Sequence, residues 1–277
     1  MELFRMSAAG NVFYLTLAEP PEEADRPALA RQICAGLGVQ GRPGSPAPGA
    51  DGLIFGRNAP PRQSMYNPDG SQGFCANGLR CLARLLADAG TLASGESILT
   101  SDGPKAVFFR EGDVELAMGP PRDLPGRPGS MRESFAVSIA QGSFAGFGVY
   151  VGNPHFVLFT DRATQARAGE LGPALERHTA FPEGVNVEFA VQEADEILVR
   201  VWERGAGETL SCGTGAAAVA AAGPKGLAPG QERRLRYPGG VLRVRRLEDG
   251  GLCLAGPVLH EGRFRWEASV RAPQRLA

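Results

Sequence analysis

Two cysteines stand at matching places in the chain, and together they could do chemistry. Cys75 precedes Ala76-Asn77-Gly78-Leu79, and Cys212 precedes Gly213-Thr214-Gly215 and an alanine-rich run. Each pattern predicts a turn and then a helix, because glycine favours turns while alanine and leucine favour helices. We therefore expect both thiols at helix N-termini, where backbone N–H groups and the helix dipole stabilise a thiolate and can hold a carboxylate. For Cys212, this position should lower the thiol pKa from about 8.5 towards neutrality.

The sequence around the two cysteines indicates two similar halves. A lone cysteine before a helix is more often a buried packing residue. Here, however, Asn67 and Arg204 each lie eight residues before a cysteine, and each is expected at the end of a strand. Two thiols that face one substrate could remove a proton from one side of a carbon and deliver a proton to the other. The net result would be inversion of a stereocentre.

Several segments resemble the signatures of the diaminopimelate epimerase family and occur in the family's order. They are Asn11, Asn67-Pro68-Asp69-Gly70-Ser71, Cys75-Ala76-Asn77-Gly78, Gly152-Asn153-Pro154-His155, Val185-Asn186-Val187, Glu203-Arg204-Gly205-Ala206-Gly207-Glu208-Thr209 and Cys212-Gly213-Thr214-Gly215. The resemblance implies an isomerase that interconverts LL- and meso-diaminopimelate without a cofactor or metal, for lysine and peptidoglycan precursor synthesis. It implies Cys75 and Cys212 as the catalytic pair, with Glu203 supporting Cys212 and His155 supporting Cys75.

The same resemblance implies two groups of substrate-binding residues. Backbone N–H groups at the two helix starts would hold the α-carboxylate, and they belong to Ala76, Asn77, Gly213 and Thr214. Polar side chains would hold the rest of the substrate, and they belong to Asn11, Asn67, Asn153, Asn186, Glu203 and Arg204. Arg204 could bind a distal carboxylate through two hydrogen bonds. Taken one at a time, these residues have ordinary alternatives, such as a turn asparagine or a surface ion pair.

Three departures from the family pattern indicate a divergent member. Val12 follows Asn11 where the family has an aspartate, and Ala76 replaces a usual glycine. The segment between Asn67 and Cys75 is also one residue shorter than expected. Two alternatives therefore stay open: a racemase of the same fold that acts on another amino acid, and an inactive relative that only binds a ligand. Retention of both cysteines favours an enzyme, because a binding protein needs no thiol.

The expected fold class is α/β (α+β), with two pseudo-symmetric domains. The resemblance implies that each domain is a mixed, mostly antiparallel sheet wrapped around a central helix, with the active site in the cleft between domains. We expect one domain from residues 1–119 plus about 259–277, and the other from residues 130–258. Residues 119–129 are rich in proline and glycine and are expected to link them.

Composition limits the kinds of partner that we expect for the protein. A net charge of −1 in 277 residues gives no support for nucleic-acid binding. No apolar run is long enough to span a membrane, and nothing near Met1 resembles a signal peptide, so we expect a cytoplasmic protein. Five scattered cysteines indicate neither a disulfide framework nor a zinc site. A small molecule is the expected partner, and the resemblance implies a homodimer.

Local patterns give further expectations that a structure can test. Arg80 and Arg84 fall opposite the apolar stripe of the helix after Cys75, which predicts a solvated or salt-bridged face. Residues 152–155 are expected to close a strand, and residues 38–52 to form a loop. Six arginines within residues 233–246 alternate with apolar residues, which favours the wet face of a hairpin over a nucleic-acid patch. Thiols on either side of one carbon could also form a disulfide when the site is empty, so oxidation should inactivate the protein reversibly.

Overall fold

A computed structural model describes residues 1–35, 49–126, 129–224, 226–266 and 274–275. The chain divides into two compact units, one of Met1–Leu116 with Pro257–Ala277 and one of Ala117–Gly256. The loop expected at residues 38–52 lies largely outside the described residues. Among the residues that are described, no helix has the length and apolar character needed to cross a membrane.

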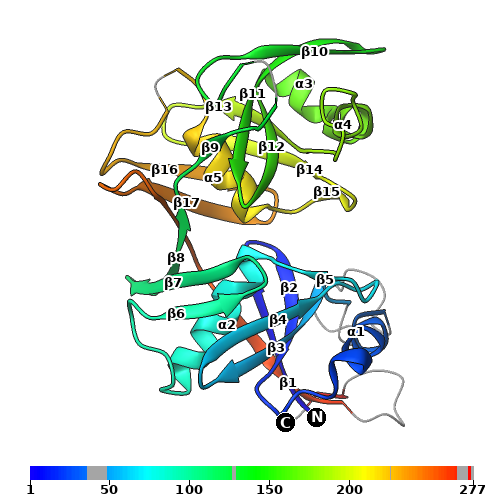
Figure 1. Ribbon diagram of the computed structural model, residues 1–277, viewed down its shortest axis with the longest axis vertical. Coiled ribbons are helices and arrows are strands. Elements are labelled where there is room, and N and C mark those ends of the chain that lie inside the picture. Colours follow the sequence, from blue (N-terminus) through cyan, green and yellow to red (C-terminus); the bar gives the residue numbers. More distant parts are fainter. Residues whose placement is uncertain (36–48, 127–128, 225, 267–273, 276–277) are drawn as a thin grey trace. The chain divides into compact units, whose positions relative to one another are not determined.

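The first unit is built from a mixed sheet and two α-helices (Figure 1). Its strands are β1 (Glu2–Ala8), β2 (Asn11–Thr16), β3 (Gly52–Asn58), β4 (Pro61–Tyr66), β5 (Gln72–Gly73), β6 (Ser97–Thr100), β7 (Gly103–Arg110), β19 (Leu259–Arg265) and β20 (Gln274–Arg275). Strand β8 (Asp113–Gly119) begins in this unit and ends in the second. A short 3-10 helix, η1 (Glu23–Asp25), leads into α1 (Arg26–Ala35), and α2 (Ala76–Asp88) follows β5. The late strand β19 pairs with β1, as expected for a chain that returns to its first domain.

The second unit contains the remaining strands and three α-helices. Its strands are β9 (Arg122–Asp123), β10 (Phe135–Ile139), β11 (Gly142–Val151), β12 (Asn153–Phe159), β13 (Asn186–Gln192), β14 (Ile197–Glu203), β15 (Gly207–Thr209), β16 (Glu232–Tyr237), β17 (Gly240–Arg246) and β18 (Leu252–Gly256). Its helices are α3 (Arg162–Ala166), α4 (Ala168–Glu176) and α5 (Gly213–Ala221). Short β9 pairs antiparallel with β11.

The two units repeat the same order of strand pairings. In the first, β1–β2 is antiparallel, β2–β3 parallel, β3–β4 and β4–β5 antiparallel, β4–β6 parallel, and β6–β7 and β7–β8 antiparallel. In the second, β11–β12 is antiparallel, β12–β13 parallel, β13–β14 and β14–β15 antiparallel, β14–β16 parallel, and β16–β17 and β17–β18 antiparallel. Helices α2 and α5 occupy the same place in this order. The predicted pseudo-symmetric α/β fold is confirmed.

Each unit wraps its sheet around one central helix. Helix α2 contacts β1, β2, β3 and β4, and α5 contacts β11, β12, β13, β17 and β18. Every residue of α5 is buried, which suits its glycine, alanine and valine composition. Small side chains let the surrounding strands approach the helix closely, and the buried apolar surface stabilises the unit.

The exposed face predicted for α2 is wrong at Arg80. The Arg80 side chain is fully buried, while Arg84 is partly exposed and lies 3.8 Å from Asp88 in an ion pair. Amphipathic spacing predicts which face of a helix packs on a core, but a helix enclosed by strands has almost no wet face. Arg80 is therefore enclosed although it lies outside the apolar stripe.

Turns and hairpins agree with the sequence-based predictions at some places and differ at others. Strands β1 and β2 form a hairpin with a turn at Ala9 and Gly10, and Asn11 begins the second strand. The expectation that residues 152–155 close a strand is wrong, because the turn is at Gly152, whose φ is 76°, and Asn153 begins β12. The arginine-rich hairpin alternates as predicted, with buried residues on its inner face at Leu235, Leu242 and Val244.

Candidate active site

Cys75 and Cys212 are the N-cap residues of α2 and α5. Their backbone angles are nearly identical, with φ −135° and ψ 123° at Cys75 and φ −131° and ψ 121° at Cys212. The first α-helical hydrogen bonds run from Leu79 N–H to the Cys75 carbonyl and from Ala216 N–H to the Cys212 carbonyl, each at 2.9 Å. The N–H groups of the residues predicted to bind carboxylate therefore precede each helical ladder: Ala76, Asn77, Gly213 and Thr214.

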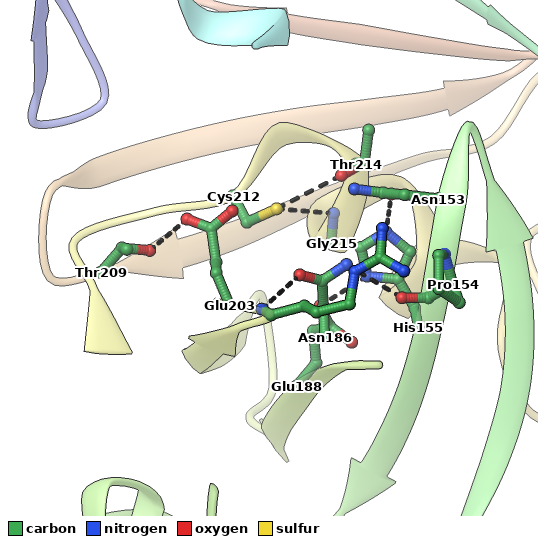
Figure 2. A network of polar contacts seen from close by, with 11 residues as sticks. Asn153, Pro154, His155, Asn186, Glu188, Glu203, Thr209, Cys212, Thr214 and Gly215 are labelled. Carbon is green, nitrogen blue, oxygen red and sulfur yellow. Dashed lines mark hydrogen bonds and ion pairs between the residues drawn. The ribbon is translucent and has the colours of Figure 1, made fainter. Parts of the chain in front are cut away.

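The Cys212 thiol lies in a small polar network (Figure 2). Its Sγ accepts a hydrogen bond from Gly215 N–H at 3.3 Å and lies 3.3 Å from Thr214 Oγ1. Glu203, the last residue of β14, lies beside this thiol, and its Oε1 accepts a 2.5 Å hydrogen bond from Thr209. The structure thus brings together Glu203 and Cys212, as the sequence predicted.

Burial and nearby negative charge favour the protonated form of the Cys212 thiol. Burial, followed by the nearby carboxylates of Glu203 and Glu188, raises the pKa of Cys212 well above its usual value, against hydrogen bonds from Thr214 and Gly215. The expected lowering of this pKa is therefore wrong. Burial also raises the pKa of Glu203, although hydrogen bonds from Thr209 and Cys212 oppose that shift. A raised pKa means that each group holds its proton more tightly than usual, which suits an acid that delivers a proton.

His155 lies on β12, and both of its ring nitrogens contact polar side chains. Nδ1 is 2.7 Å from Glu188 Oε1, and Nε2 is 2.6 Å from Asn153 Oδ1. His155 and Glu188 are both fully buried and face each other across the parallel pair β12–β13. The Glu188 Oε2 atom is buried without a hydrogen-bond partner among the described residues. The role predicted for His155 towards Cys75 stays a prediction.

Asn186 and Arg204 form one structural unit. The Asn186 amide donates to the Pro154 carbonyl, and its Oδ1 accepts from Arg204 N–H, both at 2.9 Å. The exposed Arg204 guanidinium donates to the Glu183 carbonyl at 3.0 Å. Asn186 therefore positions the chain at Arg204 in this structure, and substrate binding by either residue stays a prediction.

In the first unit, a chain of hydrogen bonds joins the start of α2 to the β1–β2 turn. Arg80 Nη2 donates to Asn77 Oδ1 at 2.7 Å, and Asn77 Nδ2 donates to Asn11 Oδ1 at 2.7 Å. Asn11 Nδ2 in turn lies 3.4 Å from Asp51 Oδ2, which also accepts from Val12 N–H at 2.7 Å. Two predicted substrate-binding asparagines are thus directly linked.

Asn67 directly follows β4, as predicted, and lies in a tight polar turn. Its amide donates to Ser71 Oγ at 2.9 Å, and Ser71 in turn donates to Asp69 through both its N–H and its hydroxyl. The hydrogen bonds from Ser71 lower the pKa of Asp69. This turn fixes the backbone between β4 and Cys75.

Sequence reasoning missed three carboxylates and one arginine around these residues. Glu176 accepts from Trp202 Nε1 at 2.7 Å and from Gly205 N–H at 3.0 Å, so it holds the turn that carries Arg204. Glu188 and Asp51 contact predicted site residues directly, and so does Arg80. A signal for Glu188 existed, because a single charge within the otherwise apolar run of residues 187–191 indicates a buried group with a partner.

The fold is shared with racemases and epimerases of known structure. A probable proline racemase from Agrobacterium radiobacter matches with a TM-score of 0.68 at 16% identity, covering 96% of this chain and 93% of that chain. A predicted epimerase from Pseudomonas aeruginosa matches with a TM-score of 0.64 at 15% identity, covering 95% and 97%. The chain therefore has the two-unit fold of these racemases and epimerases.

Sequence comparisons define the family within this class. The family model described as diaminopimelate epimerase matches residues 147–260. The diaminopimelate epimerase of Desulforudis audaxviator is 36% identical over 275 residues, covering 93% of this chain and 96% of that protein. That of Bacillus cereus is 40% identical over 234 residues, covering 76% and 79%. The chain belongs to the diaminopimelate epimerase family and is an isomerase.

Proposed function

We propose that this protein interconverts LL- and meso-diaminopimelate by a two-thiol mechanism that uses no cofactor. The observation that carries the proposal is the repeated arrangement of a cysteine N-cap on the central helix of each unit. The relatives named diaminopimelate epimerase support the choice of substrate. The reaction would serve lysine and peptidoglycan precursor synthesis, and a small molecule would be the partner of this site.

The mechanism divides the work between the two thiols. One thiolate removes the α-proton while the other thiol protonates the opposite face, so the α-carbon is inverted and the thiols exchange protonation states. The carbanion needs its charge stabilised, and N–H groups at two helix starts can do this by binding the α-carboxylate. Glu203 would support proton transfer at Cys212, because it contacts the thiol and has a raised pKa.

Recognition of the second amino-acid group is assigned to polar side chains outside the two helix starts. Arg204 carries a fixed positive charge and an exposed guanidinium that can bind a carboxylate through two hydrogen bonds. Asn67, Asn153, Asn186 and Asn11 are assigned to the same substrate. We further propose a homodimer that works in the cytoplasm, by analogy with the family.

The substrate assignment can be tested in heavy water. LL-diaminopimelate, meso-diaminopimelate, proline and histidine are each incubated with the protein in D2O, and α-deuteration is followed by NMR. Deuteration and epimerisation of diaminopimelate alone support the proposal. Turnover of only proline or histidine would replace it with a racemase of a monocarboxylic amino acid.

A further inference from the structure

A chain of three polar side chains runs across the parallel strands β12 and β13 (Figure 2). His155 is at its centre, with Nδ1 2.7 Å from Glu188 Oε1 and Nε2 2.6 Å from Asn153 Oδ1. Asn153 and His155 are two residues apart on β12, so their side chains lie on the same face of the sheet. Both nitrogens of the ring are therefore held by side chains of the same unit.

The carboxylate end of this chain packs against helix α5. Glu188 is fully buried, and a Cβ atom at Gly215 would lie 2.7 Å from Glu188 Oε1 and 3.2 Å from Cys212 Cβ. A glycine leaves room for the carboxylate at this point, in the first turn of the helix that Cys212 begins. The Glu188 carboxylate is thus fixed between the His155 ring and the start of α5.

The burial of Glu188 decides which protons the His155 ring carries. A buried carboxylate needs an opposite charge, and His155 is the only side chain within the described residues that forms an ion pair with Glu188. Imidazole is a stronger base than a carboxylate, so a proton shared by the pair resides on the ring. A charged ring that donates from Nδ1 to Glu188 also carries a proton on Nε2.

The proton on Nε2 determines how the Asn153 amide is oriented. An amide can present either its oxygen or its NH2 group to a neighbour, and only the oxygen can accept from Nε2–H. Asn153 Oδ1 faces the ring, and Asn153 Nδ2 makes no hydrogen bond within the described part of the chain. The NH2 group is thus left as a donor, which suits a carboxylate and does not suit an amino group.

We propose that Glu188 is a positioning residue for substrate recognition, which acts through His155 to hold the Asn153 amide with its NH2 group available to a carboxylate of the substrate. The inference rests on the proposed function and deepens it, because it assigns Glu188 to specificity and gives His155 a positioning role. Diaminopimelate carries carboxylates and amino groups, and a donor of fixed orientation distinguishes between them. An amide that turned freely could accept from an amino group as well as donate to a carboxylate.

The protonation of the ring can be measured without substrate. The histidine rings are labelled with 15N, and the protons on each nitrogen are read from 1H–15N correlation spectra at about pH 7.5. Both nitrogens of His155 should carry a proton. His178 is the internal control, because its Nδ1 accepts from Ala180 N–H at 3.0 Å and its Nε2 lies 3.1 Å from the Ser138 carbonyl, so that only Nε2 should be protonated. A bare nitrogen on His155 overturns the proposal.

A charge-removing variant tests the link from Glu188 to the substrate. Glu188→Gln keeps an acceptor for Nδ1–H but removes the charge, so His155 should lose the Nε2 proton and the Asn153 amide should turn. KM for diaminopimelate should then rise about 10-fold or more, while kcat changes less. The matched control is Glu193→Gln, which removes an exposed carboxylate just beyond the end of β13 and should change neither KM nor ring protonation. An unchanged KM or a retained Nε2 proton in folded Glu188→Gln overturns the proposal.

Asn153→Asp tests the donor itself and decides even if Glu188→Gln does not fold. The variant keeps an oxygen beside Nε2 and replaces the NH2 group with a second oxygen, so His155 should keep both protons while KM rises about 100-fold. Circular dichroism checks that each variant is folded. A KM within about twofold of the original value overturns the proposal.

The two kinds of measurement separate this inference from the proposed function. A bare His155 nitrogen in a protein that epimerises diaminopimelate overturns the inference alone. A doubly protonated His155 in a protein that does not turn over diaminopimelate overturns the proposed function, and the carboxylate role of Asn153 with it.

Discussion

Cys75 and Cys212 share one backbone conformation, because each is the N-cap residue of the central helix of its unit. Their φ and ψ angles differ by only a few degrees, as expected for the same N-cap position in two repeated units. Arg80 lies buried on the helix that Cys75 begins, whereas Glu203 and Glu188 act on Cys212. The repeat thus gives two thiols at equivalent helix N-termini, and the carboxylates near Cys212 help to raise the pKa of that thiol.

Replacing Glu203 with glutamine should change how stability depends on pH. Burial raises the pKa of Glu203 in the folded protein above its unfolded value of about 4.3. The folded state therefore binds the proton more tightly, and the contribution of this group to stability is full below about pH 4.3 and is lost as the pH rises through the folded pKa. We therefore compare the free energy of unfolding of Glu203→Gln with that of the original protein. The difference should favour the variant more at pH 8 than at pH 4.

Urea denaturation at both pH values measures this difference. The control is Glu193→Gln, whose carboxylate is exposed in an ion pair with Arg162 and should show little pH-dependent change. If Glu203→Gln has the same stability difference from the original protein at both pH values, the raised pKa is contradicted. The same variant should lose epimerase activity by about 100-fold or more, if Glu203 supports proton transfer at Cys212.

Removing the buried carboxylate of Glu188 should destabilise the protein. Glu188 and His155 form a fully buried pair 2.7 Å apart, and removal of one partner leaves the other without compensation. Glu188→Ala should lower the free energy of unfolding by about 3–5 kcal/mol, as for other broken buried pairs. Glu193→Ala breaks an exposed pair and should cost less than about 1 kcal/mol. Equal effects of the two variants in urea denaturation would show that the buried pair has no special role.

Arg204 should determine substrate affinity more than the rate of the chemical step. Its guanidinium is assigned to the distal carboxylate, far from the carbon that is inverted. Arg204→Met should therefore raise KM for diaminopimelate by about 10- to 100-fold and change kcat less. Arg177→Met removes another exposed arginine of the same unit and serves as the control. A loss confined to kcat, or equal KM effects in both variants, would argue against this assignment.

The sequence was most informative where residue type and local geometry agree. Glycine and alanine around Cys212 predict a turn and a helix start, and the strand ending before Arg204 follows from its apolar and β-branched residues. The same reasoning failed at Arg80, because helical periodicity does not show how far the surrounding strands cover a helix. It also missed Glu176, because its partners Trp202 and Gly205 lie far along the chain, and such long-range contacts leave little trace in local sequence.

The most direct test of the two-thiol account is the fate of the α-proton in D2O. LL-diaminopimelate is converted for a short time, and substrate and product are separated and analysed for deuterium. The account predicts one deuterium at the inverted carbon of the product and almost none in recovered substrate, and a loss of at least about 100-fold in epimerisation for both Cys75→Ala and Cys212→Ala. A product that keeps its original proton, or a wild-type rate in either cysteine variant, would contradict it.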